Sequence, residues 1–132
     1  MKEPHWITSR ALLLLHAESL AEHGGLTGLR DENGFHAAMA RPLHVFHYEP
    51  DADLSRLAAA YGFGLVRDHP FSDGNKRAGF LAILLFLDLN GSEMRVEQAD
   101  AIQTIFRLAA GKMSESDLTE WIRVHIRRGK NL

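Results

Sequence analysis

The chain has 132 residues, 45% of them hydrophobic, and its 15 Lys and Arg against 17 Asp and Glu give a formal charge of −2. This length and apolar content predict one folded domain, residues 1–132, and exclude a disordered chain. A slightly acidic charge excludes the basic face of a nucleic-acid-binding protein, and the absence of cysteine excludes disulfides and thiolate chemistry.

Nothing in the sequence indicates export or membrane insertion. The N-terminal segment MKEPHWITSR lacks the apolar core of a signal peptide. The longest apolar run, residues 80–87, is too short to cross a bilayer. We therefore expect a soluble cytoplasmic protein with no membrane partner and no direct nucleic-acid partner.

Apolar residues at helical spacing predict helices along nearly the whole chain. The first is expected to begin after Thr8 or Ser9, which suit an N-cap, and to end at the glycine pair within residues 23–25. A short second helix is expected after Asp31 and before Pro42, because a proline interrupts the hydrogen bonds of a helix interior.

Residues 41–50 hold several residues that favour strands, between two prolines, and we interpret them as an extended loop or a short hairpin-like flap. Tyr48 would either contact a target chain added at the edge of this flap or anchor the flap itself. His36, His44 and His47 have no carboxylate or thiolate at ligand spacing, which favours surface histidines over a metal site.

Two apolar helices follow, joined by a polar loop. The first is expected to begin at Asp51 or Asp53 and to end before Pro70, since the residue before a proline is disfavoured in a helix. Its small residues allow close packing against a neighbour: Ala58, Ala59, Ala60, Gly62 and Gly64. The second, residues 75–89, is apolar nearly all round, which is typical of a helix in the middle of a fold.

Two more helices are expected, at residues 99–109 with Ile102 and Phe106 in the core stripe, and from Ser114 or Ser116 through Ile126. The fold class is therefore all-α, a compact bundle of about six helices whose central buried hairpin carries the polar loop.

The polar loop and the helical turn after it, residues 69–77, read HPFSDGNKR. A histidine such as His69 can accept a proton near neutral pH. The carboxylate of Asp73 suits a hard cation such as Mg²⁺, and Gly74 lets the backbone approach a ligand. These residue types together indicate a reactive site.

Two cations, Lys76 and Arg77, fall in the first turn of the following helix, where they oppose the helix dipole. A bound polyphosphate would reverse this unfavourable placement, because the first N–H groups of the helix and both cations would share one anion. The conflict between local preference and placement favours a functional site over a solvated loop.

HPFSDGNKR resembles the Fic motif, HPFx(D/E)GN(G/K)R, and almost the whole chain is similar to the short Doc (death-on-curing) branch of the Fic/Doc family. The resemblance implies that His69 deprotonates a target hydroxyl, that Asp73 holds Mg²⁺ and that Phe71 is a structural anchor. It also implies binding of the phosphates of ATP, or of another nucleoside triphosphate, by Gly74, Asn75, Lys76 and Arg77. Arg67, about half a turn before His69, is expected at the rim of the site or as a solvated helix end.

Two departures from the adenylylating members of the family bear on the reaction. Lys76 replaces a glycine, and Phe80 stands where those members have a second arginine. Both features resemble Doc, whose members act as kinases on elongation factor Tu. The resemblance therefore implies the toxin of a toxin–antitoxin module, a phosphotransferase that arrests translation. The alternatives are a protein adenylyltransferase and a catalytically idle antitoxin-binding module.

Many family members carry an inhibitory helix with the pattern (S/T)xxxE(G/N). Residues 116–120 have this spacing, but Trp121 follows, so we identify no true copy. The resemblance then implies inhibition by a separate antitoxin of the Phd type. We expect that antitoxin in a groove beside the nucleotide site, formed partly by residues 45–48.

Overall fold

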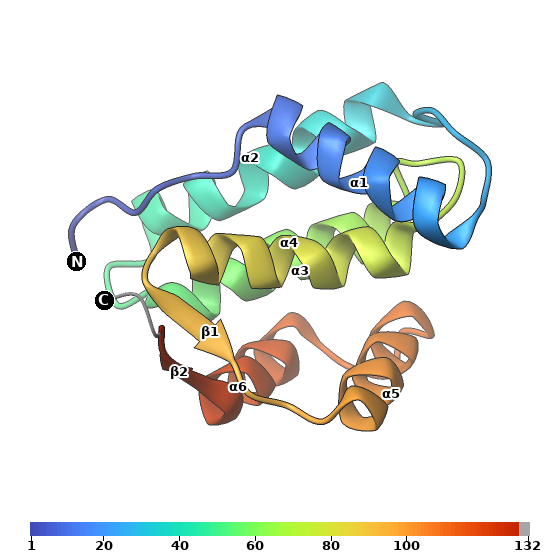
Figure 1. Cartoon of the computed structure of the whole chain (residues 1–132). Helices are drawn as coiled ribbons and strands as arrows, with labels where there is room; N and C mark the ends of the chain where they lie inside the picture. Colours follow the sequence, from blue (N-terminus) through green and yellow to red (C-terminus); the bar gives the residue numbers. More distant parts are fainter. Residues whose placement is uncertain (130–132) are drawn as a thin grey trace.

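The computed structural model describes residues 1–129 and places six α-helices and a two-stranded antiparallel sheet in three layers (Figure 1). The elements are α1 Ser9–His23, α2 Glu32–Tyr48, α3 Leu54–Asp68, α4 Asn75–Leu89, β1 Ser92–Met94, α5 Gln98–Ala109, α6 Glu115–His125 and β2 Ile126–Arg128. Helices α1 and α2 form one layer, α3 and α4 the middle layer, and α5 and α6 the third. The predicted all-α class with a central helix hairpin is confirmed.

Side chains cap the N-termini of α1, α2, α3 and α6. The capping residues are Thr8, Asp31, Asp53 and Ser114, each of which accepts a backbone N–H from the first turn of its helix. Four helices are expected to begin at a polar capping residue, and each begins at one of these four residues. The predicted starts of these helices are therefore confirmed. In residues 1–129 no helix is long and apolar enough to span a membrane.

Helix α2 shows that the flap predicted over residues 41–50 is wrong. The helix continues through Pro42 to Tyr48, and its buried face is formed by Phe35, Ala38, Met39, Pro42 and Val45. A proline in a helix interior costs on the order of 3 kcal/mol. Here the apolar face keeps its helical spacing across the proline and packs on α3, so tertiary packing outweighs local preference. Tyr48, 81% exposed, anchors nothing.

Helices α3 and α4 approach closely at two glycines. A Cβ atom on Gly62 would lie 2.5 Å from Cδ1 of Ile83, and one on Gly79 would lie 2.5 Å from Cγ2 of Val66. The predicted close packing is therefore confirmed. Helix α3 also contacts α2, α5 and α6 and lies at the centre of the molecule, whereas α4 leaves its end exposed at Leu89.

The last third of the chain differs from the prediction in two places. In α5 the core side is formed by Ala101, Ile105 and Leu108, whereas Ile102 and Phe106 are 50% and 59% exposed. Ile102 follows the buried Ala101, and Phe106 follows the buried Ile105. Each is therefore rotated by about 100° round the helix from the core side. Helix α6 ends at His125, before Ile126, because residues 126–128 adopt extended backbone and pair with β1.

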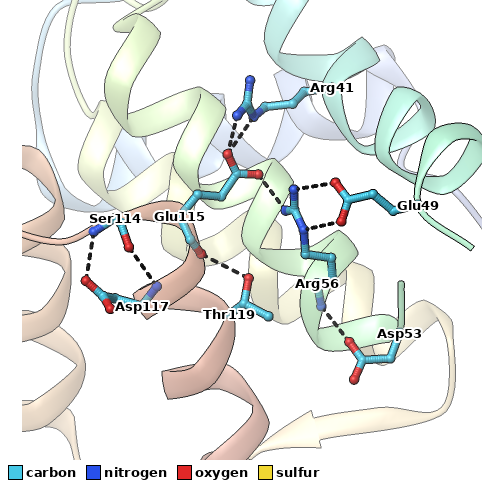
Figure 2. Close-up of polar contacts among 8 residues, drawn as sticks. All are labelled: Arg41, Glu49, Asp53, Arg56, Ser114, Glu115, Asp117 and Thr119. Atoms are coloured by element: carbon cyan, nitrogen blue, oxygen red, sulfur yellow. Dashed lines mark hydrogen bonds and ion pairs between the residues drawn. The ribbon is translucent and has the colours of Figure 1, made fainter. Parts of the chain in front are cut away.

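An ion cluster around Glu115, at the start of α6, joins three helices (Figure 2). The Glu115 carboxylate accepts hydrogen bonds from Arg41 of α2 and from Arg56 of α3, and Arg56 also binds Glu49 at 2.9 Å. Burial raises the pKa of Glu115, but the hydrogen bonds and charges of the two arginines outweigh burial and hold that pKa below its ordinary value of 4.5.

We predict that Glu115→Gln lowers the free energy of unfolding at pH 7 by about 1.5–3 kcal/mol, the range for hydrogen bonds to charged groups. Because the pKa of Glu115 is lowered by folding, its stabilising effect is complete above pH 4.5 and is lost as the pH falls through the folded-state pKa. The variant should therefore lose less stability than the parent on acidification below that pH.

Urea unfolding at neutral pH and through the acid range measures both effects. The matched control is Glu120→Gln, on the same helix, where the carboxylate is 64% exposed and pairs with Arg123. This control should change the free energy of unfolding by less than about 1 kcal/mol. Equal losses in the two variants would contradict a special role for the Glu115 cluster.

Candidate active site

The loop between α3 and α4 begins with a strained residue. His69 caps α3 at φ 48° and ψ 53° and has, within residues 1–129, the only positive φ of a residue other than glycine. Such a conformation costs about 1–3 kcal/mol, and the following proline disfavours the right-handed helical region, so α3 ends before His69. The His69 side chain is exposed, so its imidazole is open to a substrate.

The connection between α1 and α2 holds the strained backbone in place. The Arg30 guanidinium donates two hydrogen bonds to the His69 carbonyl oxygen, from Nε at 3.1 Å and from Nη2 at 2.5 Å. The backbone N–H groups of Arg30 and Asp31 donate to the Pro70 carbonyl oxygen at 2.8 and 3.0 Å. Figure 1 shows this connection beside the loop that joins α3 and α4. These bonds use backbone atoms of the loop and leave the His69 ring free.

Phe71 and Asn75 fix the middle of the loop. Phe71 is 1% exposed and lies edge-on to Phe35, with 5.7 Å between ring centroids. The Asn75 side chain accepts the Phe71 N–H at 2.9 Å and donates to the Phe71 carbonyl oxygen at 3.0 Å. The oxygen and the nitrogen of this amide both bond the loop backbone, and the backbone N–H of Asn75 lies in the first turn of α4, which has no side-chain cap.

The Asp73 carboxylate is exposed, and two backbone N–H groups hold it. Its Oδ1 accepts from Gly74 at 3.0 Å, and its Oδ2 accepts from Leu26 at 3.2 Å. Among the described residues, no three His, Asp or Glu side chains gather to hold a metal ion. Mg²⁺ commonly takes one or two carboxylates and completes its shell with substrate phosphates and water, so a single fixed carboxylate fits this ion.

The N-terminus of α4 offers unpaired donors. Its N-cap is Gly74, at φ 76° and ψ 22°, and neither a side-chain cap nor an acidic residue accompanies the first turn. Lys76 and Arg77 in that turn are exposed, and the Lys76 Nζ lies 5.2 Å from the centroid of the Phe106 ring. Free N–H groups, the helix dipole and two cations together favour binding of an anion.

A groove of about 590 Å³ runs from Lys76 and Arg77 between α4 and α5. Its apolar lining includes Phe80, Ile102 and Phe106, which accounts for the exposure of the last two side chains. The sequence gives no sign of this groove, because it depends on the angle between two helices.

Arg67 lies in the last turn of α3, exposed, with its guanidinium 5.4 Å from the centroid of the Phe63 ring. The structure thus places Arg67 near the loop, with its guanidinium against a neighbouring aromatic ring. His36, His44 and His47 are exposed on α2, as expected of surface histidines.

One site residue has no motif in the sequence. His16 of α1 is 5% exposed, and its Nε2 lies 2.8 Å from the Asp73 carbonyl oxygen. The available signal is its spacing of four residues from Leu12 and Leu20, which places it on the buried face of α1.

The prediction that residues 45–48 form part of an antitoxin groove beside the site is wrong. These residues end α2, whose first residues adjoin the loop between α3 and α4, and 17 helical residues span about 25 Å. Val45 is 8% exposed and faces the core. The error follows from the wrong flap, since a helix carries these residues away from the site.

The fold and its loop are those of the Fic/DOC family, to which the chain belongs: a profile of that family matches residues 6–87. The protein kinase doc of Escherichia phage P1 is 30% identical over 117 residues, which cover 89% of this chain and 92% of that protein. The toxin Doc of Mycolicibacterium smegmatis is 36% identical over 85 residues, 64% of this chain and 65% of that protein.

We predict that Phe71→Ala lowers the free energy of unfolding by about 3–5 kcal/mol, as for other buried aromatic truncations. Chemical denaturation measures the change. Phe106→Ala is the control, since this ring is 59% exposed and its loss should leave the free energy of unfolding nearly unchanged. A Phe71→Ala variant as stable as the control would show that the loop needs no buried anchor.

Proposed function

We propose that this protein is a Doc-type toxin that transfers the γ-phosphate of ATP, or of another nucleoside triphosphate, to a hydroxyl of a translation protein, with elongation factor Tu as the expected target. The observation that carries the proposal is the uncapped N-terminus of α4, flanked by Lys76 and Arg77 and directly preceded by the loop of His69 and Asp73. Membership of the Fic/DOC family and the likeness to a phage protein named as a kinase support it.

Phosphoryl transfer needs mainly positioning and neutralisation of charge. In the proposed reaction the first N–H groups of α4, Lys76 and Arg77 bind the phosphates. The target hydroxyl oxygen forms a bond to the γ-phosphorus while the bond to the β-phosphate oxygen breaks, and the nucleoside diphosphate leaves. His69 accepts the hydroxyl proton, for which its exposed imidazole is accessible.

Asp73 is the residue that would hold Mg²⁺. When bound, this ion supplies neutralisation of the phosphate charge. The backbone N–H groups of Leu26 and Gly74 keep the Asp73 carboxylate in position, so the chain does not have to order it when the ligand arrives.

Two side chains favour a kinase over an adenylyltransferase. Lys76 adds bulk and a point charge where the adenylylating members have a glycine. Phe80, at the position of their second arginine, lines the apolar groove and cannot bind a phosphate. One anchor for a β,γ-diphosphate leaving group is therefore missing, which supports a nucleotide bound with its terminal phosphate toward His69.

An antitoxin of the Phd type is the proposed partner. The proposed location is the cytoplasm, where translation takes place. The relatives named as Doc toxins support this assignment. The segment with the spacing of the inhibitory motif is engaged in structural contacts instead: Glu120 pairs with Arg123 of the same helix, and the Trp121 indole donates to Asp100 of α5 at 3.1 Å.

We predict that His69→Ala abolishes growth arrest and lowers the transfer rate by a factor of about 10²–10⁴, the usual effect of losing a general base. The melting temperature should stay close to that of the parent, because the ring makes no packing contact in the core. His44→Ala, an exposed histidine of α2, should keep both activities. Undiminished growth arrest by a folded, well-expressed His69→Ala protein would overturn the role of this histidine.

We predict that the target keeps label from a triphosphate labelled at the γ position and none from one labelled at the α position. Purified protein, target and MgATP in parallel reactions, followed by mass spectrometry of the target, should show the mass of one phosphoryl group. Retention of the α label would restore the adenylyltransferase. Absence of both labels, together with absence of nucleotide binding, would favour the idle module.

A further inference from the structure

His16 is the buried histidine of the described chain, and it contacts the catalytic loop on three sides. Its ring stacks on Phe71, with 3.6 Å between centroids and 12° between planes. Its Nε2 lies 2.8 Å from the Asp73 carbonyl oxygen. A Cβ atom on Gly74 would lie 3.4 Å from the same nitrogen, so the ring closes the inner side of the turn.

The polar contact fixes the tautomer of His16. A carbonyl oxygen can only accept, so Nε2 must carry a proton and donate it to Asp73. The donor comes from α1, across a separation of 57 residues, and is almost wholly screened from water. A bond of this kind holds a peptide unit in one orientation more firmly than an exposed bond would.

The peptide unit held by His16 joins Asp73 to Gly74 and thus lies between the two functional parts of the site. Turning the Asp73 carbonyl inward fixes the backbone from which the Asp73 carboxylate projects to solvent. It also fixes the left-handed Gly74, which begins α4 and sets the direction of the first N–H groups of that helix. One buried donor therefore orients both the carboxylate and the anion-binding end.

We propose that His16 is a positioning residue of the nucleotide site, which its Nε2–H orients by holding the Asp73–Gly74 peptide; this inference rests on the proposed function. His16 does not touch the substrate. Its contribution separates into two parts: the ring stacks on Phe71 and stabilises the fold, and the donor sets the affinity for MgATP.

Three variants separate the two parts. His16→Gln loses the ring but places an amide N–H at the reach of Nε2. His16→Asn carries the same amide one methylene shorter, so that its donor falls short of the Asp73 oxygen. His16→Phe keeps a ring to stack on Phe71 and has no donor. The Gln and Asn variants therefore carry the same amide and differ in how far it extends toward the Asp73 carbonyl oxygen.

We expect His16→Gln to bind MgATP within about twofold of the parent, and His16→Asn and His16→Phe to bind it about tenfold or more weakly, the usual effect of losing a partner that orients a ligand-binding group. Calorimetry with MgATP gives the affinities, and thermal unfolding gives the stabilities. His16→Phe should melt closest to the parent, so that affinity and stability change in different orders among the three variants.

Two readouts need no nucleotide. Amide hydrogen exchange at Ala78, whose N–H donates to the Gly74 carbonyl oxygen at 2.9 Å, should be faster in His16→Asn and His16→Phe than in the parent and His16→Gln. The ¹⁵N shifts of the His16 ring in the neutral state should show the proton on Nε2.

The outcomes distinguish failure of the proposed function from failure of the inference about His16. If the parent does not bind MgATP, the proposed function fails, and the exchange and ring-shift measurements still judge the role of His16. If the parent binds and all three variants bind equally well, or lose affinity in proportion to their melting temperatures, His16 is a structural residue and the inference is overturned.

Discussion

The close approach of α3 and α4 at Gly62 and Gly79 is the constraint on which the rest of the structure depends. Because the two helices are antiparallel and in near-backbone contact, the end of one and the start of the other come together at one end of the hairpin. The short loop between them has little freedom, and His69 takes a left-handed conformation. The strained residue and the exposed start of α4 both follow from this packing.

The bonds that Arg30, His16 and Asn75 make to the loop share one property, which matters for chemistry. Arg30 bonds the carbonyl of His69, His16 bonds the carbonyl of Asp73, and Asn75 bonds both backbone groups of Phe71. The loop is thus fixed through its backbone, and the imidazole and carboxylate remain directed to solvent. Such a site is ordered before any ligand binds, the condition under which electrostatic stabilisation is most effective.

The sequence predicts what depends on neighbours along the chain and misses what depends on packing. Asp53 and Ser114 mark helix starts because a cap bonds residues of its own first turn. The loop motif is contiguous in the sequence and can therefore be identified without the structure. The continuation of α2 through Pro42 depends on α3, and the tie of His16 to the loop joins residues 57 apart, so neither has a local signature. Exposure of Ile102 follows from the orientation of α5 against α4.

The start of α4 shows how stability and function oppose each other in this chain. Helices α1, α2, α3 and α6 have a side-chain cap, which is worth about 1 kcal/mol. Helix α4, one of the central pair, has none and carries Lys76 and Arg77 against its dipole. A capping carboxylate would occupy the first N–H groups and repel an anion, and at position 74 the left-handed backbone, with φ 76°, would strain any side chain. The glycine leaves those donors open, and in the proposed function the stability lacking in the free protein would become available as binding energy for a phosphate.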